Sequence, residues 1–193
     1  MEQHFTRKKG DPQNVSSEGS KLFQPTSRYV MYDKTNKIWI SQRKRTYLLW
    51  FKFLQHCERD ESRTVDWSKY EGWGGSNKVL GSKFDDWWKE HWLECFGIKN
   101  RTDTPKFSTG RISHFDSLRC YLLVHEYGLK FPELSLFELG VKLDQDESKK
   151  RYPIESFFVP VHEDPTIWLQ KRMSVYRQKS KMIMDNVCQG KFP

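Results

Sequence analysis

The chain has 193 residues, of which 36% are hydrophobic and 15% are aromatic, and its formal net charge is +8. This length suits one domain, or one domain with a satellite lobe, and the eight tryptophans provide enough apolar surface to exclude disorder along the whole chain. The longest uncharged apolar runs fall far short of the roughly 20 residues that cross a bilayer, so no membrane-spanning segment is expected.

The first 57 residues are expected to form an arm, a hairpin or irregular segment, and a helix. Residues 1–26 are polar and lack an apolar period, which predicts a disordered basic arm. Residues 29–40 place a turn-forming centre between two apolar runs, a pattern that allows either a short hairpin or an irregular lead-in. Residues 41–57 predict a helix, because their apolar side chains recur at helical spacing: Tyr47, Trp50, Phe51, Leu54 and Cys57.

Two further helices are predicted between residues 66 and 97, with a glycine-rich turn at 74–77 between them. Serine-led tetrapeptides at 68–71 and 82–85 both fit the capping box of a helix N-terminus. The second of these helices carries a broad apolar stripe that includes Trp87, Trp88 and Trp92. We expect this stripe to be core or a partner-docking face, because stacking on nucleic-acid bases requires exposed rings.

The next two predicted helices follow a helix-turn-helix rhythm. A polar linker at 98–111 is the best candidate for a domain boundary. Capping boxes at 113–116 and 135–138 open the two helices, and Gly128 is expected to end the first. The second should be short, since residues 144–164 are acidic and contain prolines, which is typical of a surface loop.

The longest helix is predicted from Asp164-Pro165 to Val187, with Gly190 ending it. Its apolar stripe would dock on the rest of the domain or on a second copy of the chain, and it consists of Leu169, Met173, Tyr176, Ser180, Ile183 and Val187. Basic residues lie off this stripe, so one face of the helix is expected to be exposed and positively charged.

Together these patterns predict a mainly α-helical fold of about six helices. Its C-terminal half is helix-turn-helix-like and ends in a long basic helix. The expected division is a disordered basic arm at 1–26, an aromatic-rich helical lobe at 27–100 and a helix-turn-helix-like lobe at 101–193.

Catalytic and metal-binding patterns are weak. The chain has no phosphate-cradling glycine loop with a lysine, no nucleophile elbow and no HExxH. His91 and Cys95 are four positions apart, which could place two zinc ligands on one helix face, and Cys120 with His125 could supply more. Both pairs lie in apolar stripes typical of core residues. Carboxylates at 85–86 and 144–147 would suit magnesium in a nuclease, yet the first pair lies at a helix N-terminus, which stabilises carboxylates, and the second group lies in the expected loop. We therefore expect no enzyme, no cofactor and no metal site.

Cysteine usage and the N-terminal sequence bear on the cellular compartment. The four cysteines form no Cys-x-x-Cys pair, which is typical of reduced and mostly buried thiols. No apolar stretch follows the basic residues near Met1, so no secretory signal is expected. These observations predict a cytoplasmic protein.

Positive charge is concentrated at the two ends of the chain. Residues 1–52 hold 11 basic and 4 acidic residues, and residues 171–193 hold 6 basic residues and 1 acidic residue. Clustered positive charge attracts polyanions, and with the helix-turn-helix rhythm it predicts binding to double-stranded DNA. The residues expected at the interface are basic side chains from two helices. Arg43, Lys44 and Arg45 are expected to contact the phosphate backbone of the DNA, together with Lys171, Arg172, Arg177 and Lys179. Arg172 or Arg177 is the expected base reader, because arginine to guanine is the commonest specific contact.

Three segments carry a resemblance to a known group of proteins: KFDDWWKEHWLECFG, FDSLRCYLLVHEYG and VYRQKSKMIMDNVCQGKFP. Over residues 45–193 the chain resembles poorly characterised helix-turn-helix proteins of bacterial mobile elements and phages. The most specific match is the ending Asn186-Val187-x-x-Gly190-x-Phe192-Pro193. The resemblance implies a small DNA-binding or accessory protein in a bacterial host cell.

A second class of function stays open, because the predicted loop at 144–164 separates helices that a compact recognition unit would join closely. A phage or phage-satellite protein could instead be a structural or assembly factor that docks on coat or other proteins. Its docking residues would be apolar ones: Trp87, Trp88, Trp92, Leu169, Met173, Tyr176 and Ile183. The two classes differ in salt dependence, since DNA binding weakens steeply as salt rises.

Overall fold

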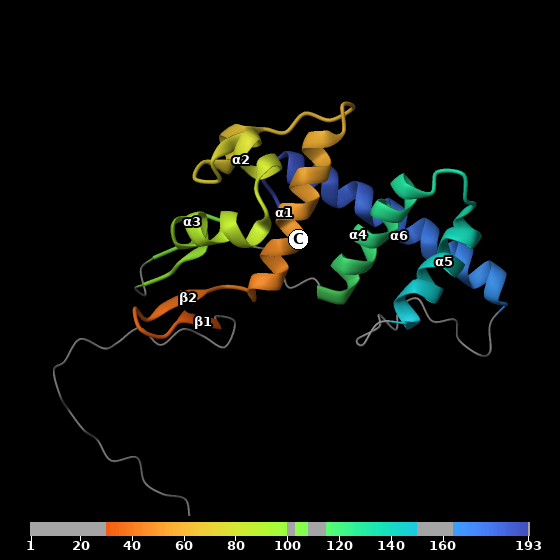
Figure 1. Cartoon of the computed structure of the whole chain (residues 1–193), viewed down its shortest axis with the longest axis horizontal. Helices are drawn as coiled ribbons and strands as arrows, with labels where there is room; N and C mark the ends of the chain where they lie inside the picture. Colours follow the sequence, from red (N-terminus) through yellow and green to blue (C-terminus); the bar gives the residue numbers. More distant parts are fainter. Residues whose placement is uncertain (1–29, 100–102, 108–114, 150–163, 193) are drawn as a thin grey trace, which may run out of the picture.

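The computed structural model describes residues 30–99, 103–107, 115–149 and 164–192 (Figure 1). Within these ranges the chain forms six α-helices, one 3-10 turn and a two-stranded sheet, which confirms the predicted mainly α-helical fold of about six helices. The predicted arm at 1–26 lies outside the described residues, as do parts of the linker predicted at 98–111 and of the loop predicted at 144–164.

The N-terminal segment is a hairpin, the first of the two alternatives that its sequence allows. Strand β1 (Val30–Asp33) pairs antiparallel with β2 (Ile38–Ile40). The Asp33 carboxylate accepts the backbone N–H groups of Thr35 and Asn36 at 2.9 and 3.0 Å, which fixes the turn. Both isoleucines of β2 are buried, so the hairpin lies against the core.

Helix α1 (Lys44–Arg59) is the centre of the aromatic half of the molecule. It begins three residues after the predicted start, because Arg43 is extended and caps the helix. Around it lie the 3-10 turn η1 (Trp67–Tyr70), α2 (Gly75–Gly81) and α3 (Phe84–Phe96). The largest buried side chains gather here: Tyr47, Trp50, Phe51, Phe53, Tyr70, Trp73, Trp87, Trp88 and Phe96.

The predicted helix starts at 68–71 and 82–85 are wrong. Asp66 caps η1, and its carboxylate accepts both the N–H and the hydroxyl of Ser68, so a charged acceptor replaces the serine cap. Lys83, one residue after Ser82, is the N-cap of α3 and makes no side-chain capping bond. The glycine-rich turn predicted at 74–77 is shorter than expected, because α2 already begins at Gly75.

Three helices form the C-terminal half: α4 (Phe115–Lys130), α5 (Leu136–Ser148) and α6 (Pro165–Cys188). The capping box at Ser135 is confirmed, because both of its reciprocal hydrogen bonds with Glu138 are present. The predicted start of α6 is confirmed as well, since the Asp164 carboxylate accepts the N–H groups of Thr166 and Ile167.

Two predicted boundaries in this half are wrong. Gly128 lies inside α4 and does not end it. Residues 144–148, predicted as loop, continue α5. Two of their carboxylates have partners on α4 that local sequence does not reveal: the Tyr127 hydroxyl donates to Asp146 at 3.0 Å, and Arg119 donates to the buried Glu147 at 3.3 Å.

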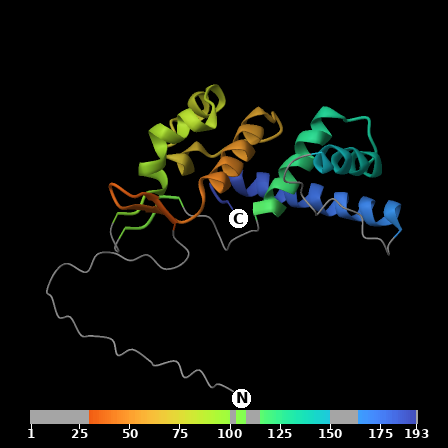
Figure 2. The ribbon, with the colours of Figure 1, turned by 60° about the horizontal axis from the view of Figure 1, so that its bottom comes forward.

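Helix α6 contributes to both hydrophobic clusters of the molecule. It packs against α5, α4 and α1 in turn, from its N-terminus to its C-terminus (Figures 1 and 2). Leu169, Met173 and Tyr176 belong to a cluster with α4 and α5, whereas Ile183 and the residues after it join the aromatic cluster around α1. The helix therefore ties the two halves together, and the division into lobes at residue 100 stays a prediction.

The crossing of α5 and α6 depends on the glycine at position 140. A Cβ atom at Gly140 would lie 2.5 Å from Cγ of the buried Leu169, whereas one at Gly128 would meet no described atom within 4 Å. We expect Gly140→Ala to lower the free energy of unfolding by about 1–3 kcal/mol through overpacking. Gly128→Ala, also inside a helix, should raise it by about 0.5–1 kcal/mol. Urea denaturation measures both, and similar values for the two variants would contradict this packing.

The Tyr70 hydroxyl links three elements through the buried core. It donates to the Val187 carbonyl at 2.5 Å and accepts the Trp50 indole N–H at 3.2 Å. We expect Tyr70→Phe to lower the free energy of unfolding by about 1–3 kcal/mol, because both partners would be buried without a bond. Tyr121→Phe is the control, since no hydrogen bond joins that hydroxyl to a described residue, and the free energy of unfolding should change by no more than about 0.5 kcal/mol.

Candidate nucleic-acid interface

The charged residues on the exposed side of α6 are all basic over most of its length. From Pro165 to Met184 the sequence holds five basic residues and no acidic one. Lys171, Arg177, Lys179 and Lys181 are exposed, and none of them forms an ion pair with a described carboxylate. Asp185, the first acidic residue of the helix, pairs with Arg63. The positive charge of this surface is therefore not neutralised by the part of the chain that is described.

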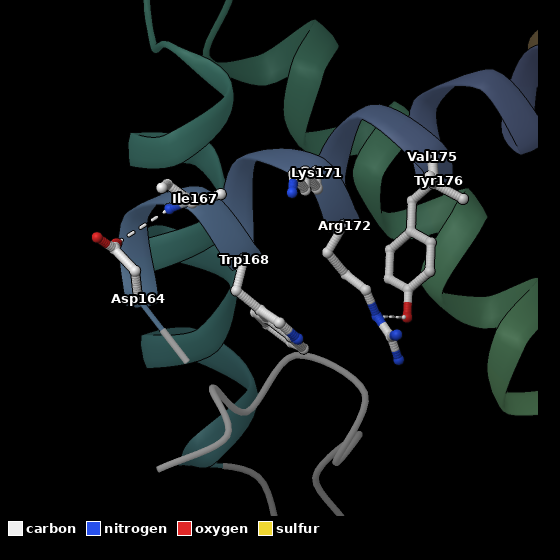
Figure 3. Close-up of a pocket in the computed structure, with 7 residues that line it drawn as sticks. All are labelled: Asp164, Ile167, Trp168, Lys171, Arg172, Val175 and Tyr176. Atoms are coloured by element: carbon white, nitrogen blue, oxygen red, sulfur yellow. Dashed lines mark hydrogen bonds between the residues drawn. The ribbon is translucent and has the colours of Figure 1, made fainter. Parts of the chain in front are cut away.

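A pocket of about 400 Å³ lies along the first turns of α6 (Figure 3). Arg172 is held there by aromatic neighbours: its Nε donates to the Tyr176 hydroxyl at 2.7 Å, and its guanidinium lies 5.3 Å from the Trp168 ring centre. Cation–π contact and a hydrogen bond reduce the freedom of the side chain. Lys171 lines the same pocket, so the structure brings these two predicted residues together.

A second and larger cavity, the α4–α6 groove, has a volume of about 620 Å³. Arg177 and Lys181 line it from α6, and His125 and Gly128 line it from α4. Arg63 completes the wall and is held by Asp60 at 2.9 Å and by Asp185. Lys181 belongs to the basic face that the sequence predicts for this helix but was not among the predicted DNA contacts, although it follows Arg177 by one helical turn and thus shares its side of α6.

Three of the four predicted basic residues of α6, all except Lys171, fall on two flanks of the helix. Positions 172 and 177 are about 140° apart around the helix axis at 3.6 residues per turn. They accordingly line different cavities, Arg172 the pocket at the helix start and Arg177 the α4–α6 groove. Lys179 is seven positions after Arg172 and shares its flank. The two arginines therefore do not face the same ligand surface.

Two of the three predicted basic residues at the start of α1 have partners within the chain. Lys44 pairs with Asp85 of α3 at 2.6 Å and lies over the Phe84 ring, and this ion pair lowers the pKa of Asp85. The Arg45 guanidinium lies 4.2 Å from the ring centre of Phe115. Arg43 is exposed. The unfavourable position of these cations at a helix N-terminus is thus partly compensated from within, which sequence reasoning missed because Asp85 is distant in the chain.

Most residues predicted to dock a partner lie in the chain's own core. Trp87 and Trp88 are 0% and 1% exposed, which leaves no ring surface for a partner and corrects their predicted docking role. The predicted α6 stripe is buried against α4, α5 and α1, so of its two predicted alternatives it docks on the rest of this chain: Leu169, Met173, Tyr176 and Ile183. Trp92 is half-buried against the aromatic cluster.

The exposed apolar residues of α6 are different ones. Ile167, Val175 and Met182 are 52%, 49% and 47% exposed. They are spaced by eight and seven positions, so they form one ridge on the outer side of the helix, opposite the buried stripe. Lys171 and Gln178 lie on the same ridge, which we call the outer ridge. The sequence spacing of these three residues fits one side of a helix, but they were not predicted as an exposed ridge because the buried stripe has more apolar residues.

A histidine pair lies beside the α4–α6 groove. The rings of His56 and His125 are 4.9 Å apart, and His56 also contacts the Glu126 carboxylate at 3.3 Å. Burial, together with the charges of His56 and Arg63, lowers the pKa of His125 to about 4. Cys120, which sequence spacing allowed as a zinc ligand beside His125 but which was expected to be a core residue, is buried in the cluster of α4, α5 and α6. The described residues contain no group of three metal-ligating side chains.

Comparison with family models, with curated proteins and with solved structures finds no match to this chain. Among the helices that the structure describes, none is both long and apolar enough to cross a membrane. The functional conclusion therefore depends on the surface of α6, and the resemblance to helix-turn-helix proteins stays a prediction.

The histidine pair predicts a pH dependence of stability. The pKa of His125 falls on folding from 6.5 to about 4, so the unfolded chain binds a proton more readily. Its contribution to stability is therefore fully present above about pH 6.5 and is lost as the pH falls toward 4. His125→Asn should flatten this part of the profile of unfolding free energy against pH. An unchanged slope between pH 6.5 and 4 would contradict the environment described for this ring.

Proposed function

We propose that this protein binds double-stranded DNA through the outer side of α6, in a non-catalytic regulatory or accessory role. The observation that carries the proposal is the run from Pro165 to Met184, which has five basic residues and no acidic residue. The exposed lysine and arginine side chains of this run form no ion pair with a described carboxylate. Phosphate contacts from lysine and arginine supply most of the affinity of such interfaces.

The two-flank arrangement suits a helix that lies in the major groove. The groove is about 12 Å wide and an α-helix with its side chains is about 10–12 Å across, so the outer ridge would face the base edges. Arg172 and Lys179 would then approach one phosphate backbone, and Arg177 and Lys181 the other. In this pose the arginines position the helix, and Lys171 and Gln178 are the residues closest to the bases.

The exposed apolar residues of the outer ridge support a second candidate, a structural or assembly role of a phage or phage-satellite protein. Ile167, Val175 and Met182 are each about half exposed and share one side of the helix. An apolar ridge flanked by charges is also how a helix docks into a groove of a protein partner or of a second copy of the chain. Salt separates the two candidates, since counterion release makes DNA binding strongly salt-dependent.

The first test is the affinity for random-sequence duplex DNA, measured by fluorescence anisotropy at about 50 and 200 mM salt. We expect Lys171→Ala combined with Lys179→Ala to weaken binding about tenfold and to reduce the slope of log affinity against log salt by about 2. The matched control is Lys34→Ala with Lys89→Ala, which removes the same charge from the hairpin turn and from α3.

Two results would contradict DNA binding by α6. One is no saturable binding of the wild-type chain at the lower salt concentration. The other is an equal loss in the α6 variant and in the control, since that would assign the effect to net charge and not to this helix.

A further inference from the structure

The α4–α6 groove contains a buried hydroxyl group without a partner. Ser180 lines the groove, is 2% exposed, and its Oγ forms no hydrogen bond with any described residue. It interrupts an otherwise apolar buried face of α6. A buried polar group without a bond costs free energy, and a ligand that accepts a hydrogen bond from it would recover that cost.

The charges around this hydroxyl are favourable for an anion. Arg63, Arg177 and Lys181 line the groove, and no carboxylate is among its lining residues. Asp60 and Asp185 both pair with Arg63, so these three residues together carry one net negative charge and Arg63 is not available to an anion. Arg177 and Lys181 form no ion pair with described carboxylates, so two cations one helical turn apart remain uncompensated beside Ser180.

The opposite wall of the groove is kept open by a glycine inside a helix. Gly128 lies in α4, where glycine is less favourable than alanine by about 1 kcal/mol. Packing does not require it, because a Cβ atom there would meet no described atom within 4 Å. The space that a side chain would occupy is part of the groove.

We propose that the α4–α6 groove binds a phosphate group, with Arg177 and Lys181 as its cationic contacts and the Ser180 hydroxyl as a donor at its floor. This inference goes beyond DNA binding, because it assigns one discrete site with its own ligand chemistry. The group has two sources, a free phosphate compound or the backbone of a nucleic acid, and the same side chains would recognise either.

Inorganic pyrophosphate, titrated by calorimetry at constant ionic strength with chloride as the balancing anion, tests the site without DNA. We expect saturable binding by the wild-type chain, and a loss of about tenfold in Ser180→Ala, the effect of one hydrogen bond to a charged group. Ser180→Ala should leave the stability of the free protein unchanged or higher, because the hydroxyl has no described partner to lose.

Two further variants control for charge and for shape. Lys181→Ala should weaken pyrophosphate binding about tenfold, whereas Lys179→Ala, two residues away on the other flank, should leave it within about twofold. Gly128→Leu should fill the groove and abolish binding while the helix stays folded, since leucine favours helices. No saturable pyrophosphate binding, or equal losses in Lys181→Ala and Lys179→Ala, would overturn the proposal.

A competition experiment identifies the source of the phosphate and separates this inference from the proposed function. If pyrophosphate displaces labelled duplex DNA from the wild-type chain but not from Ser180→Ala, the groove binds a backbone phosphate. If pyrophosphate binds and DNA is unaffected, the groove binds a free phosphate compound. DNA binding without any pyrophosphate binding would overturn the groove site and leave the DNA proposal intact. Pyrophosphate binding without DNA binding would do the reverse.

Discussion

The C-terminal end of α6 is fixed by hydrogen bonds from the opposite half of the chain, and the arrangement of the other helices depends on this anchor. A helix end leaves its last carbonyls without partners inside the helix. Here the Tyr70 hydroxyl donates to Val187, the Cys57 thiol donates to Met184, and the Asp66 N–H donates to Cys188. The first two donors precede their acceptors by 117 and 127 residues. Burial raises the pKa of both Tyr70 and Cys57, so both groups stay protonated donors at neutral pH.

This anchor determines which side of α6 meets solvent. With the last turns inside the aromatic cluster and Leu169 against Gly140 at the other end, the rotation of the helix about its axis is set by both clusters. One side is buried from Leu169 to the end of the helix, so the charged residues must lie on the outer ridge or on the flanks. The separation of Arg172 from Arg177 follows from this geometry, and it explains why a single basic helix presents two different binding environments.

Local patterns in the sequence predicted elements well where the decisive contacts are local. The N-termini of α5 and α6 are capped by side chains next to them in the sequence, Ser135 with Glu138 and Asp164 before Pro165. Both predicted helix starts are confirmed. The predictions failed where the decisive contact comes from a residue distant in the sequence. In residues 144–148 the carboxylates of Asp146 and Glu147 bind Tyr127 and Arg119 of α4, and Lys44 is paired with Asp85 from another helix. For the site, charge patterning predicted four basic residues of α6, but their division between flanks, and the groove itself, required the packing of α4 against α6.

The α4–α6 groove combines two local features that each reduce stability. Ser180 places a hydroxyl without a hydrogen-bond partner in an apolar buried face, where a larger apolar side chain would pack better. Gly128 has a lower helix propensity than alanine and leaves open space beside α4. Either one alone would be an ordinary imperfection of a marginally stable fold. They line the same cavity from facing helices, beside the two cations of α6 that lack described ion pairs. Because three unrelated kinds of residue converge on one volume, a ligand that accepts hydrogen bonds and carries negative charge accounts for all of them, whereas packing accounts for none.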